Sequence, residues 1–351
     1  MKKLLGASTI VALSTIALTA CGGSDDSQGS TGSPTKLVVS TWGFSEDFFR
    51  EEVYAPFEKE HNVEIVLDIG NNAERLNKIR QGTADIDVVY LSDFYAQQAI
   101  NDDLFEKIDR SNIPNLEEIY DIAKAPLGED YGPAYTIGQF GIAYNADEID
   151  GEISSWADLW NSNLANNLTI PGITTTTGPM FLDAASKVAG EESFNEDAAF
   201  AKLEELSPNI VKEYDKTSDF VNMFTQGEIA AGPFMEMYFN DLKEAIPAAK
   251  FVAPSEGGYA VMNTVNIVKD SKNKELAEEF INFQLSKDIQ ETTAKAKIDS
   301  PVNTTVELTD EEAEGITYGQ DVIDGLNQLD MAEVNENSAG WIERWNQEIA
   351  K

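Results

Sequence analysis

Apolar positions in the first part of the chain alternate between two patterns. Short runs rich in β-branched residues are typical of buried strands, and stretches in which apolar positions recur every three or four residues are typical of helices. The predicted strands cover residues 36–40, 63–69 and 88–91, and the predicted helices cover residues 47–60, 73–81 and 94–101. Strands that alternate with helices across short connections predict an α/β fold with a largely parallel sheet.

The same alternation continues through the rest of the chain. The predicted elements are an extended stretch at 135–145, a helix at 155–161, a strand at 168–170, a helix at 180–189, a strand at 259–268 and a helix at 273–285. Two extended stretches contain glycine, near 138–145 and near 257–263, and would suit crossings between two lobes. A chain of 351 residues is long enough to form two lobes.

The N-terminus has a pattern of its own. Two lysines precede an apolar run at 4–18, which predicts an export signal and, at roughly 15 residues, is too short to span a bilayer. Residues 18–22, Leu-Thr-Ala-Cys-Gly, resemble the bacterial lipoprotein signal, and this resemblance implies removal of residues 1–20 and attachment of a lipid to Cys21. The alternative is an ordinary signal peptide with an unrelated cysteine. Cys21 is the only cysteine, so it has no partner for an intramolecular disulfide.

The segment after the cysteine is polar. Residues 21–34 contain almost nothing apolar, which predicts a flexible tether. No later segment approaches the roughly 20 apolar residues of a transmembrane helix. The lipid on Cys21 would then be the only membrane anchor, and it would hold the protein at the outer face of the cytoplasmic membrane or in the periplasm.

Composition narrows the possible functions. The chain carries 62 acidic and 25 basic residues, and its formal net charge of −37 argues against nucleic acid or anionic lipid as a partner. This charge could reflect adaptation to salt, or it could steer cationic ligands. Because His61 is the only histidine, His-based catalytic triads, Cys–His dyads and multi-histidine metal sites are excluded. We therefore expect no enzymatic activity, no cofactor and no metal, with a carboxylate-dependent hydrolase as the alternative.

Six short motifs together resemble one known family. They are Lys-Leu-Val-Val-Ser-Thr-Trp at 36–42, Tyr-Ala-Pro-Phe-Glu-Lys-Glu at 54–60, Ala-Asp-Ile-Asp-Val-Val at 84–89, Ser-Ser-Trp-Ala-Asp-Leu-Trp at 154–160, Glu-Gly-Gly at 256–258, and the helical stretch at 274–283. In this order and spacing they resemble the bacterial spermidine/putrescine-binding proteins of ABC importers. The resemblance extends from residue 36 to about residue 303.

This resemblance implies a fold and a mode of action. The fold would be a two-lobed clamshell of the periplasmic-binding-protein kind, type II-like, with two hinge crossings. With the crossings read from the sequence, we expect residues 36–141 and 259–310 to form the first lobe, and residues 142–258 and 311–351 to form the second. A small molecule would bind between the lobes as a monomer closes around it, and a membrane permease would recognise the closed form.

The resemblance also implies a ligand site, in which aromatic side chains enclose a polyamine and carboxylates pair with its ammonium groups. Trp42 matches the aromatic residue of the first loop, but the acidic and tyrosine positions that follow it in the family fall on Phe44 and Ser45. Asp93 and Phe94 fall near the aromatic positions of the second loop. Asn263 replaces an amine-binding aspartate. Each ammonium buried without a carboxylate would cost several kcal/mol, so the lost carboxylates leave the ligand open.

A different loop, at residues 174–179, carries threonines where the family has an acidic pair. Thr175, Thr176 and Thr177 precede Pro179 and a predicted helix, and their hydroxyl and backbone donors would suit a carboxylate, phosphate or phosphonate. The alternative is that a threonine only caps the helix. Glu236, like Asp93, could meet a cation, so a zwitterion would also fit.

Three further positions complete the candidate ligand site. They are Gln139 and Tyr259, which lie on the two crossings, and Tyr238, which follows Glu236. No adjacent pair of tyrosines of the kind that binds ferric iron is present. The sequence therefore predicts a lipid-anchored binding protein of an ABC importer. Its ligand is expected to be a polyamine-like amine or, alternatively, an anionic or zwitterionic solute, and a signalling or adhesion protein is a further alternative.

Overall fold

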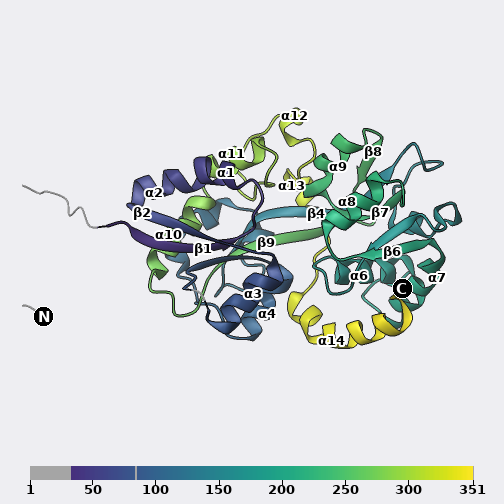
Figure 1. Cartoon of the computed structure of the whole chain (residues 1–351), viewed down its shortest axis with the longest axis horizontal. Coiled ribbons are helices and arrows are strands. Elements are labelled where there is room, and N and C mark those ends of the chain that lie inside the picture. Colours follow the sequence, from purple (N-terminus) through teal and green to yellow (C-terminus); the bar gives the residue numbers. More distant parts are fainter. Residues whose placement is uncertain (1–32, 84, 351) are drawn as a thin grey trace, which may run out of the picture. The chain divides into compact units, whose positions relative to one another are not determined.

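The computed structural model describes residues 33–83 and 85–350 (Figure 1). The predicted signal, Cys21 and most of the predicted tether lie outside these residues. From Thr35 onward the described residues form one unit, which we call the body. Its strands are β1 (Thr35–Thr41), β2 (Val63–Ile69), β3 (Val88–Ser92), β4 (Ala134–Asn145), β5 (Leu168–Pro171), β6 (Ile210–Tyr214), β7 (Ala231–Met235), β8 (Ala249–Val252) and β9 (Tyr259–Ile267).

These strands form one mixed sheet of nine strands, in the order β2-β1-β3-β9-β4-β7-β5-β6, with β8 paired to β4. Strand pairs are parallel at the two ends of the sheet, between β1 and its neighbours and between β5 and its neighbours. They are antiparallel in the middle, where β9 pairs with β3 and β4, and β4 pairs with β7 and β8. The expectation of a largely parallel sheet is therefore correct only at the ends, because the two crossing strands run against their neighbours.

Helices cover the sheet. They are α1 (Glu46–Phe48), α2 (Ala55–His61), α3 (Asn72–Gln81), α4 (Asp93–Asn101), α5 (Asp121–Lys124), α6 (Gly178–Val188), α7 (Glu196–Leu206), α8 (Thr217–Thr225), α9 (Phe239–Ala245), α10 (Lys274–Gln284), α11 (Lys287–Lys295), α12 (Asp310–Ala313), α13 (Gln320–Asp324) and α14 (Met331–Glu348). A π-helix at Phe49–Tyr54 joins α1 to α2, and short 3-10 helices include Trp156–Trp160 and Glu236–Tyr238.

Three predicted helices differ from the observed ones by more than one residue at an end or in helix type. The helix predicted at 47–60 is interrupted by the π-helix, just before Pro56, which has no amide hydrogen to donate to a regular α-helix. The helix predicted at 155–161 is the 3-10 helix Trp156–Trp160. The helix predicted from residue 180 begins earlier, at Gly178. Pro179 fits the first turn of the helix, because an amide hydrogen at that position would have no partner within the helix.

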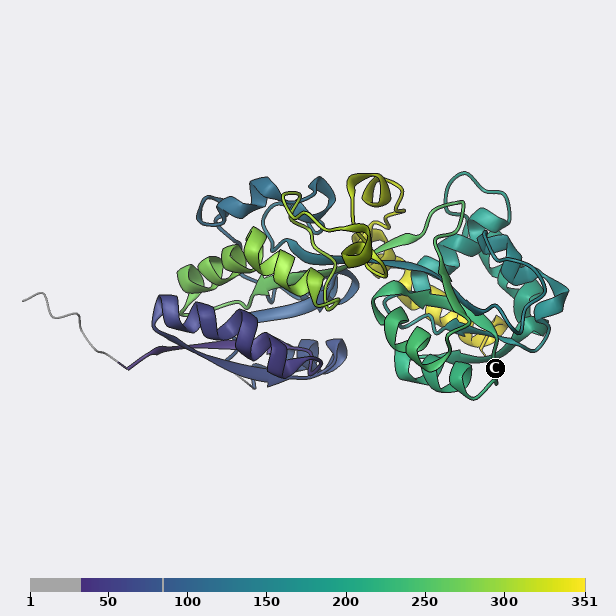
Figure 2. The ribbon, with the colours of Figure 1, turned by 90° about the horizontal axis from the view of Figure 1, so that it is seen from above.

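The two largest of the four apolar cores among the described residues lie at the two ends of the sheet, and β4 and β9 contribute to both. Ile137 of β4 packs in the core around Leu37, Tyr90 and Phe280, which belongs to the first lobe. Phe140, only three residues later on β4, packs in the core around Trp156 of the second lobe. The two strands therefore cross between the lobes, as Figure 2 shows.

The C-terminal helix α14 packs on the second lobe. Trp341 and Trp345 lie on one face of this helix and are buried in the second core. Their indole N–H groups donate to Glu196 at 3.1 Å and to Glu213 at 3.0 Å. Both tryptophans therefore serve packing. Among the described residues, no helix is both long enough and apolar enough to cross a membrane.

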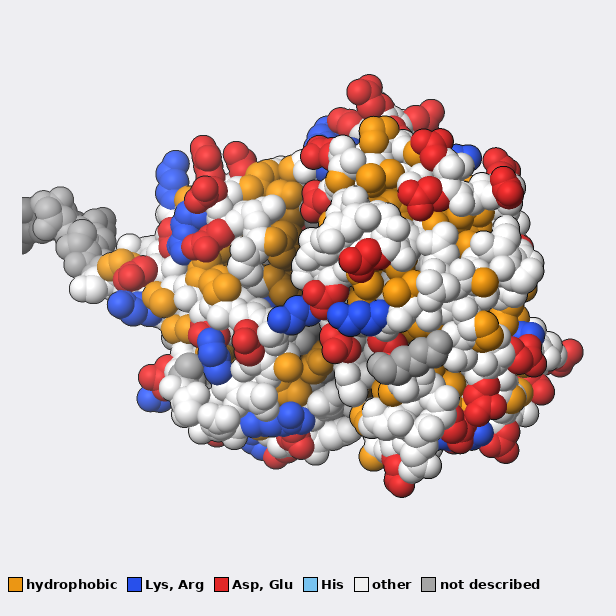
Figure 3. Space-filling model, turned by 45° about the vertical axis from the view of Figure 1, so that its right-hand side comes forward, with side chains coloured by type: hydrophobic (Ala, Val, Ile, Leu, Met, Phe, Trp, Pro, Cys, Tyr) orange, Lys and Arg blue, Asp and Glu red, His pale blue; other side chains and the backbone are white. Residues whose placement is uncertain are grey.

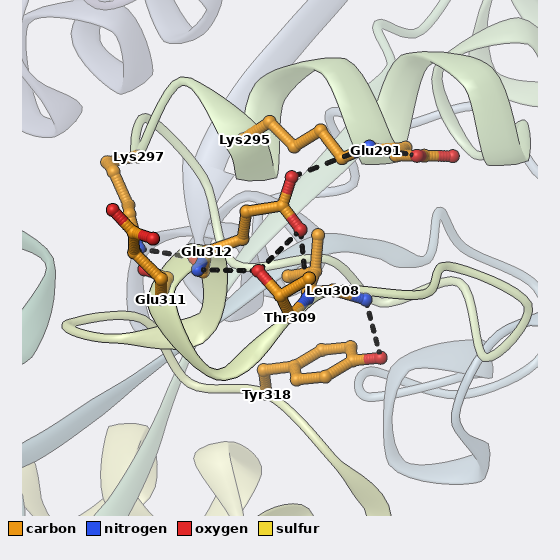
Figure 4. Close-up of polar contacts among 8 residues, drawn as sticks. All are labelled: Glu291, Lys295, Lys297, Leu308, Thr309, Glu311, Glu312 and Tyr318. Atoms are coloured by element: carbon orange, nitrogen blue, oxygen red, sulfur yellow. Dashed lines mark hydrogen bonds and ion pairs between the residues drawn. The ribbon is translucent and has the colours of Figure 1, made fainter.

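A polar cluster holds the segment after α11 in place (Figure 4). Glu312 and Thr309 form a reciprocal capping box at the start of α12, and Lys295 of α11 lies 3.7 Å from the Glu312 carboxylate. Lys297 donates to the carbonyl of Glu311 at 2.9 Å and to that of Glu312. The hydroxyl of Tyr318 accepts from the backbone N–H of Leu308 at 3.2 Å. These contacts fix the chain on both sides of residues 298–307.

Candidate ligand-binding site

A pocket lies where loops of the two lobes meet, and we call it the interlobe pocket. Its lining residues are Trp42, Phe44, Asn72, Ser92, Thr176, Met235, Met237, Tyr238, Val261 and Asn263. Several of them follow or end strands of the two parallel sets. Trp42 follows β1 and Ser92 ends β3, which run parallel in the first lobe, and Met235 ends β7, which runs parallel to β5 in the second lobe and opposite to β1 and β3. The carboxyl ends of parallel strands are the usual place for a ligand in an α/β fold. In the space-filling view, acidic side chains are spread over the face shown, and apolar side chains line a hollow between the two halves (Figure 3).

An aromatic pocket adjoins the interlobe pocket and shares Trp42 and Phe44 with it. Tyr90 and Tyr135 also line it, with their ring centroids 4.8 Å apart in an edge-to-face arrangement. The ring of Trp42 lies 6.1 Å from that of Tyr90 and 6.5 Å from that of Tyr135. Aromatic faces arranged in this way can enclose an alkyl stem and attract a cation.

Arg75 of α3 lies behind Trp42, and the sequence analysis did not select it. Its guanidinium carbon is 4.0 Å from the centroid of the Trp42 ring, and its side chain is 0% exposed. Nη2 donates to Oδ1 of Asn72 at 2.9 Å, whereas Nε and Nη1 have no partner among the described residues. Burial lowers the pKa of Arg75 to about 10, so the guanidinium stays charged at neutral pH. This places a positive charge next to two residues that line the interlobe pocket.

Asp299 is a second residue that the sequence analysis missed. It lines the aromatic pocket together with Trp42, and it also lines a neighbouring cavity together with Met237 and Asn263. Its side chain is 4% exposed, and Oδ1 has no hydrogen-bond partner in the described structure. Burial raises the pKa of Asp299 to about 7, although the nearby hydroxyl of Thr136 lowers it in part. A cationic group of a ligand could pair with this carboxylate.

The structure brings together five of the residues selected from the sequence. They are Trp42, Phe44, Thr176, Tyr238 and Asn263, and all of them line the interlobe pocket.

The three threonines before α6 have different roles, two structural and one at the pocket. The hydroxyl of Thr175 donates to the carbonyl of Gly172 at 2.8 Å and accepts from the N–H of Gly178 at 3.1 Å, so this residue forms the turn before α6. Thr177 is buried at the N-cap position of α6. Thr176 alone of the three lines the pocket, and its hydroxyl lies 3.1 Å from that of Ser92.

Asp93 and Phe94 lie at the start of α4 and do not line the interlobe pocket. The Asp93 carboxylate is fully buried and accepts from the backbone N–H of Phe94 at 2.8 Å. Burial raises the pKa of Asp93 to about 7, and backbone hydrogen bonds lower it in part. Phe94 packs in the core of the second lobe. A sequence pattern cannot distinguish such inward-facing positions from a neighbouring position that faces the ligand.

Three other selected residues are held by protein contacts outside the interlobe pocket. The hydroxyl of Tyr259 donates to Oδ2 of Asp183 at 2.6 Å. The carboxylate of Glu236 accepts from the hydroxyl of Thr317 at 2.6 Å; burial raises its pKa, and this hydrogen bond lowers it in part. Gln139 is buried on β4 beside Gly258. In the part of the chain that the structure describes, no three His, Cys, Asp or Glu residues gather as a metal site would require.

Comparison with known proteins points to one family. The family profile described as bacterial extracellular solute-binding protein matches residues 83–323. The crystal structure of an ABC transporter from Clostridium perfringens ATCC 13124 is 46% identical and has a TM-score of 0.80, over 89% of this chain and 99% of that one. The spermidine/putrescine-binding periplasmic protein of Salmonella typhimurium is 27% identical over 251 residues, which cover 68% of this chain and 70% of that protein. The putrescine-binding periplasmic protein of Escherichia coli is 25% identical over 285 residues, 72% of this chain and 74% of that protein.

Proposed function

This chain belongs to the family of bacterial extracellular solute-binding proteins, and from that premise we propose that it captures a small amine-bearing solute in the interlobe pocket and delivers it to an ABC permease. The observation that carries this proposal is the lining of the pocket. Trp42 and Ser92 of the first lobe face Thr176 and Tyr238 of the second, so a solute held between them would touch both lobes. Contacts that exist only when the lobes are closed would shift the population toward the closed form.

The aromatic pocket supports an amine as part of the ligand. Trp42, Tyr90 and Tyr135 offer ring faces for an alkyl stem and a cation, and Asp299 offers a carboxylate. Two of the relatives described above are named as binders of spermidine or putrescine, which are amines with alkyl stems. Binding would proceed without turnover.

For the closure of the lobes around the solute, we propose that residues 36–141 and 259–310 form one lobe and that residues 142–258 form the main part of the other. The segment that follows residue 310 would divide between them. Ile323 packs in the core of the first lobe, whereas Trp341 packs in that of the second. The hinge would then include the connection before α14 as well as β4 and β9.

For the location, we propose that the export signal and Cys21 deliver the body to the outer side of the cytoplasmic membrane as a lipid-anchored monomer. The proposal rests on the sequence at 4–22. Two of the relatives described above are named periplasmic proteins, which agrees with a place outside the cytoplasm.

Thermal unfolding of the full chain, with Cys21→Ser to prevent lipidation, tests the binding function. Putrescine, spermidine and short amino acids are the probes, and a solute at 100 times its Kd should add about 2.7 kcal/mol to the free energy of unfolding. Trp42→Leu should abolish the stabilisation by the ligand. Trp160→Leu is the matched control, because Trp160 packs on Phe181 in the second lobe and does not line the interlobe pocket. Equal stabilisation of both variants would contradict the proposed site.

A further inference from the structure

Arg75 is a buried charge whose protein partners are incomplete. Arginine is almost never fully buried unless its charge is paired, because removing it from water costs several kcal/mol. Within the described residues, its side chain donates only to Asn72, a neutral amide, and Nε and Nη1 remain without partners. An anionic group that could accept from these two N–H groups would offset the cost of burial.

The surroundings of Arg75 favour an anion from the ligand. Trp42, which covers the guanidinium, and Asn72, which accepts from it, both line the interlobe pocket. The residues that line this pocket include hydroxyl and amide groups and no aspartate or glutamate. Hydroxyl and amide groups can donate to the oxygens of a carboxylate, phosphonate or sulfonate. The pocket on this side therefore has the chemistry of an anion site.

Asp299 supplies the opposite charge on another side of the same region. It lines the aromatic pocket together with Trp42 and Phe44, and it lines the neighbouring cavity together with Met237 and Asn263. All four of these residues also line the interlobe pocket. Burial is the main cause of the raised pKa of Tyr135 and of Tyr238, and both charges also act on these tyrosines, since Asp299 raises the pKa of each and Arg75 lowers it. The two charges thus act on the same space.

We propose that the ligand is a short zwitterion, whose anionic group binds Arg75 and whose ammonium group binds Asp299 between the aromatic faces. This inference rests on the proposed function, because it assigns the chemical class of solute for the same pocket. A polyamine would bring a second ammonium group toward Arg75, where two like charges repel each other at low dielectric. A zwitterion places a favourable charge at each end.

Isothermal titration of the full-length Cys21→Ser protein tests this assignment. The probes are 4-aminobutyrate, 2-aminoethylphosphonate and 2-aminoethanesulfonate as zwitterions, putrescine as a diamine, and butyrate as an anion. We expect at least one zwitterion to bind tenfold or more tightly than putrescine and butyrate, since each of these lacks one of the two charge pairs. If putrescine bound more tightly than every zwitterion, the assignment of a zwitterionic ligand would be overturned and the proposed function would stand. Failure of every amine to bind the folded protein would overturn the proposed function itself.

Variants separate the two charges. Arg75→Met should weaken zwitterion binding roughly 100-fold and make putrescine binding tighter, because the repulsion of the second ammonium group is lost, and Arg75→Lys should restore part of the zwitterion affinity. Arg80→Met is the matched control on the same helix, because Arg80 pairs with Asp102 at 2.6 Å on the surface. Asp299→Asn should also weaken binding, whereas Asp93→Asn should not, because Asp93 is a buried carboxylate that lines neither the aromatic pocket nor the interlobe pocket. Equal zwitterion affinity in Arg75→Met and the parent protein would overturn the assignment, provided that both give the same far-UV spectrum.

Discussion

The hydroxyl groups of Ser92 and Thr176 lie 3.1 Å apart, although one residue ends a strand of the first lobe and the other lies in a loop of the second. Either hydroxyl can donate to the other. Such a contact exists only while the lobes are close together. It therefore contributes to the closed form in addition to any contact with the ligand.

Removing this contact should reduce the population of the closed form. A neutral hydrogen bond contributes about 0.5–1.5 kcal/mol, so Ser92→Ala should raise the Kd of the ligand roughly 2- to 12-fold. Titration calorimetry measures the Kd, and small-angle scattering should show a larger radius of gyration without ligand. Thr225→Val serves as the control, because its hydroxyl bonds within its own helix. An unchanged Kd in Ser92→Ala would mean that the contact does not bias closure.

Ligand affinity should depend on pH through Asp299. The pKa of this buried carboxyl is raised to about 7, so it is increasingly protonated below neutral pH and cannot then pair with an ammonium group. Arg75, with a pKa of about 10, keeps its charge over this range. We expect the Kd to rise as the pH falls from 8 to 6. Titrations of Asp299→Asn should show weak binding with little dependence on pH, and a parallel pH profile in this variant would exclude Asp299 as the cause.

The stability of the ligand-free protein should change with pH in the opposite sense. Asp93 and Asp299 both have a pKa of about 7 in the folded protein, above the roughly 3.9 of an unfolded aspartate. Their contribution to the free energy of unfolding is fully present below about pH 4 and is lost as the pH rises to about 7, with a slope of up to about 1.4 kcal/mol per pH unit for each group. Urea unfolding between pH 4 and pH 8 measures this slope.

Asparagine substitutions assign that slope to individual residues. Asp93→Asn and Asp299→Asn should each flatten the fall in stability with pH, and the double variant should flatten it further. Only Asp299→Asn should also change the pH dependence of ligand binding. Identical slopes in the single variants and the parent protein would show that neither carboxyl carries the effect.

The hydrogen bond between Tyr259 and Asp183 should matter for stability rather than for binding. The tyrosine is buried, and its hydroxyl donates to a carboxylate at 2.6 Å. Tyr259→Phe should lower the free energy of unfolding by about 1.5–3 kcal/mol, because the carboxylate loses a buried donor. Chemical denaturation measures the loss, and Tyr131→Phe, a partly exposed tyrosine, is the control. A large rise in the ligand Kd in Tyr259→Phe would instead indicate a role in binding.

Cys21 should determine where the protein is found. Cys21→Ser should abolish incorporation of labelled fatty acid and move the protein from the membrane fraction to the soluble fraction, because no lipid can be attached to a serine oxygen by the same thioether chemistry. Immunoblots of fractionated cells measure the distribution. Ser24→Ala, three residues later, is the control. Membrane retention of the Cys21→Ser protein would require another anchor.

The elements of the fold could largely be predicted from the sequence, because each depends on local periodicity. The strand predicted at 63–69 agrees residue for residue with β2, and the predicted helix at 73–81 differs from α3 by one residue. The direction of β4 and β9 relative to their neighbours could not be predicted, since it depends on strand order in the assembled sheet. That order is set by packing between residues far apart in the chain.

The candidate site could be predicted only in part. Trp42 is selected because it directly follows a predicted strand, and Thr176 because it lies in a polar loop before a predicted helix; both line the interlobe pocket. Arg75 was missed because a charged residue within a predicted helix normally faces water. Asp299 was missed because it approaches Trp42 only after α10 and α11 have packed. In both cases the sequence contains the residue but gives no sign of its burial.

The pairing of β4 with β9 has a mechanical consequence. The two strands are hydrogen-bonded side by side from Ala134 to Phe140, opposite Thr264 to Tyr259. Two strands joined in this way form a ribbon. Such a ribbon bends out of its own plane more readily than its two strands slide past each other within that plane. The lobes should therefore rotate about one main axis and should not slide past each other. Ligands of different length would stop this rotation at different angles, so a permease that recognises one angle could reject a solute that binds well.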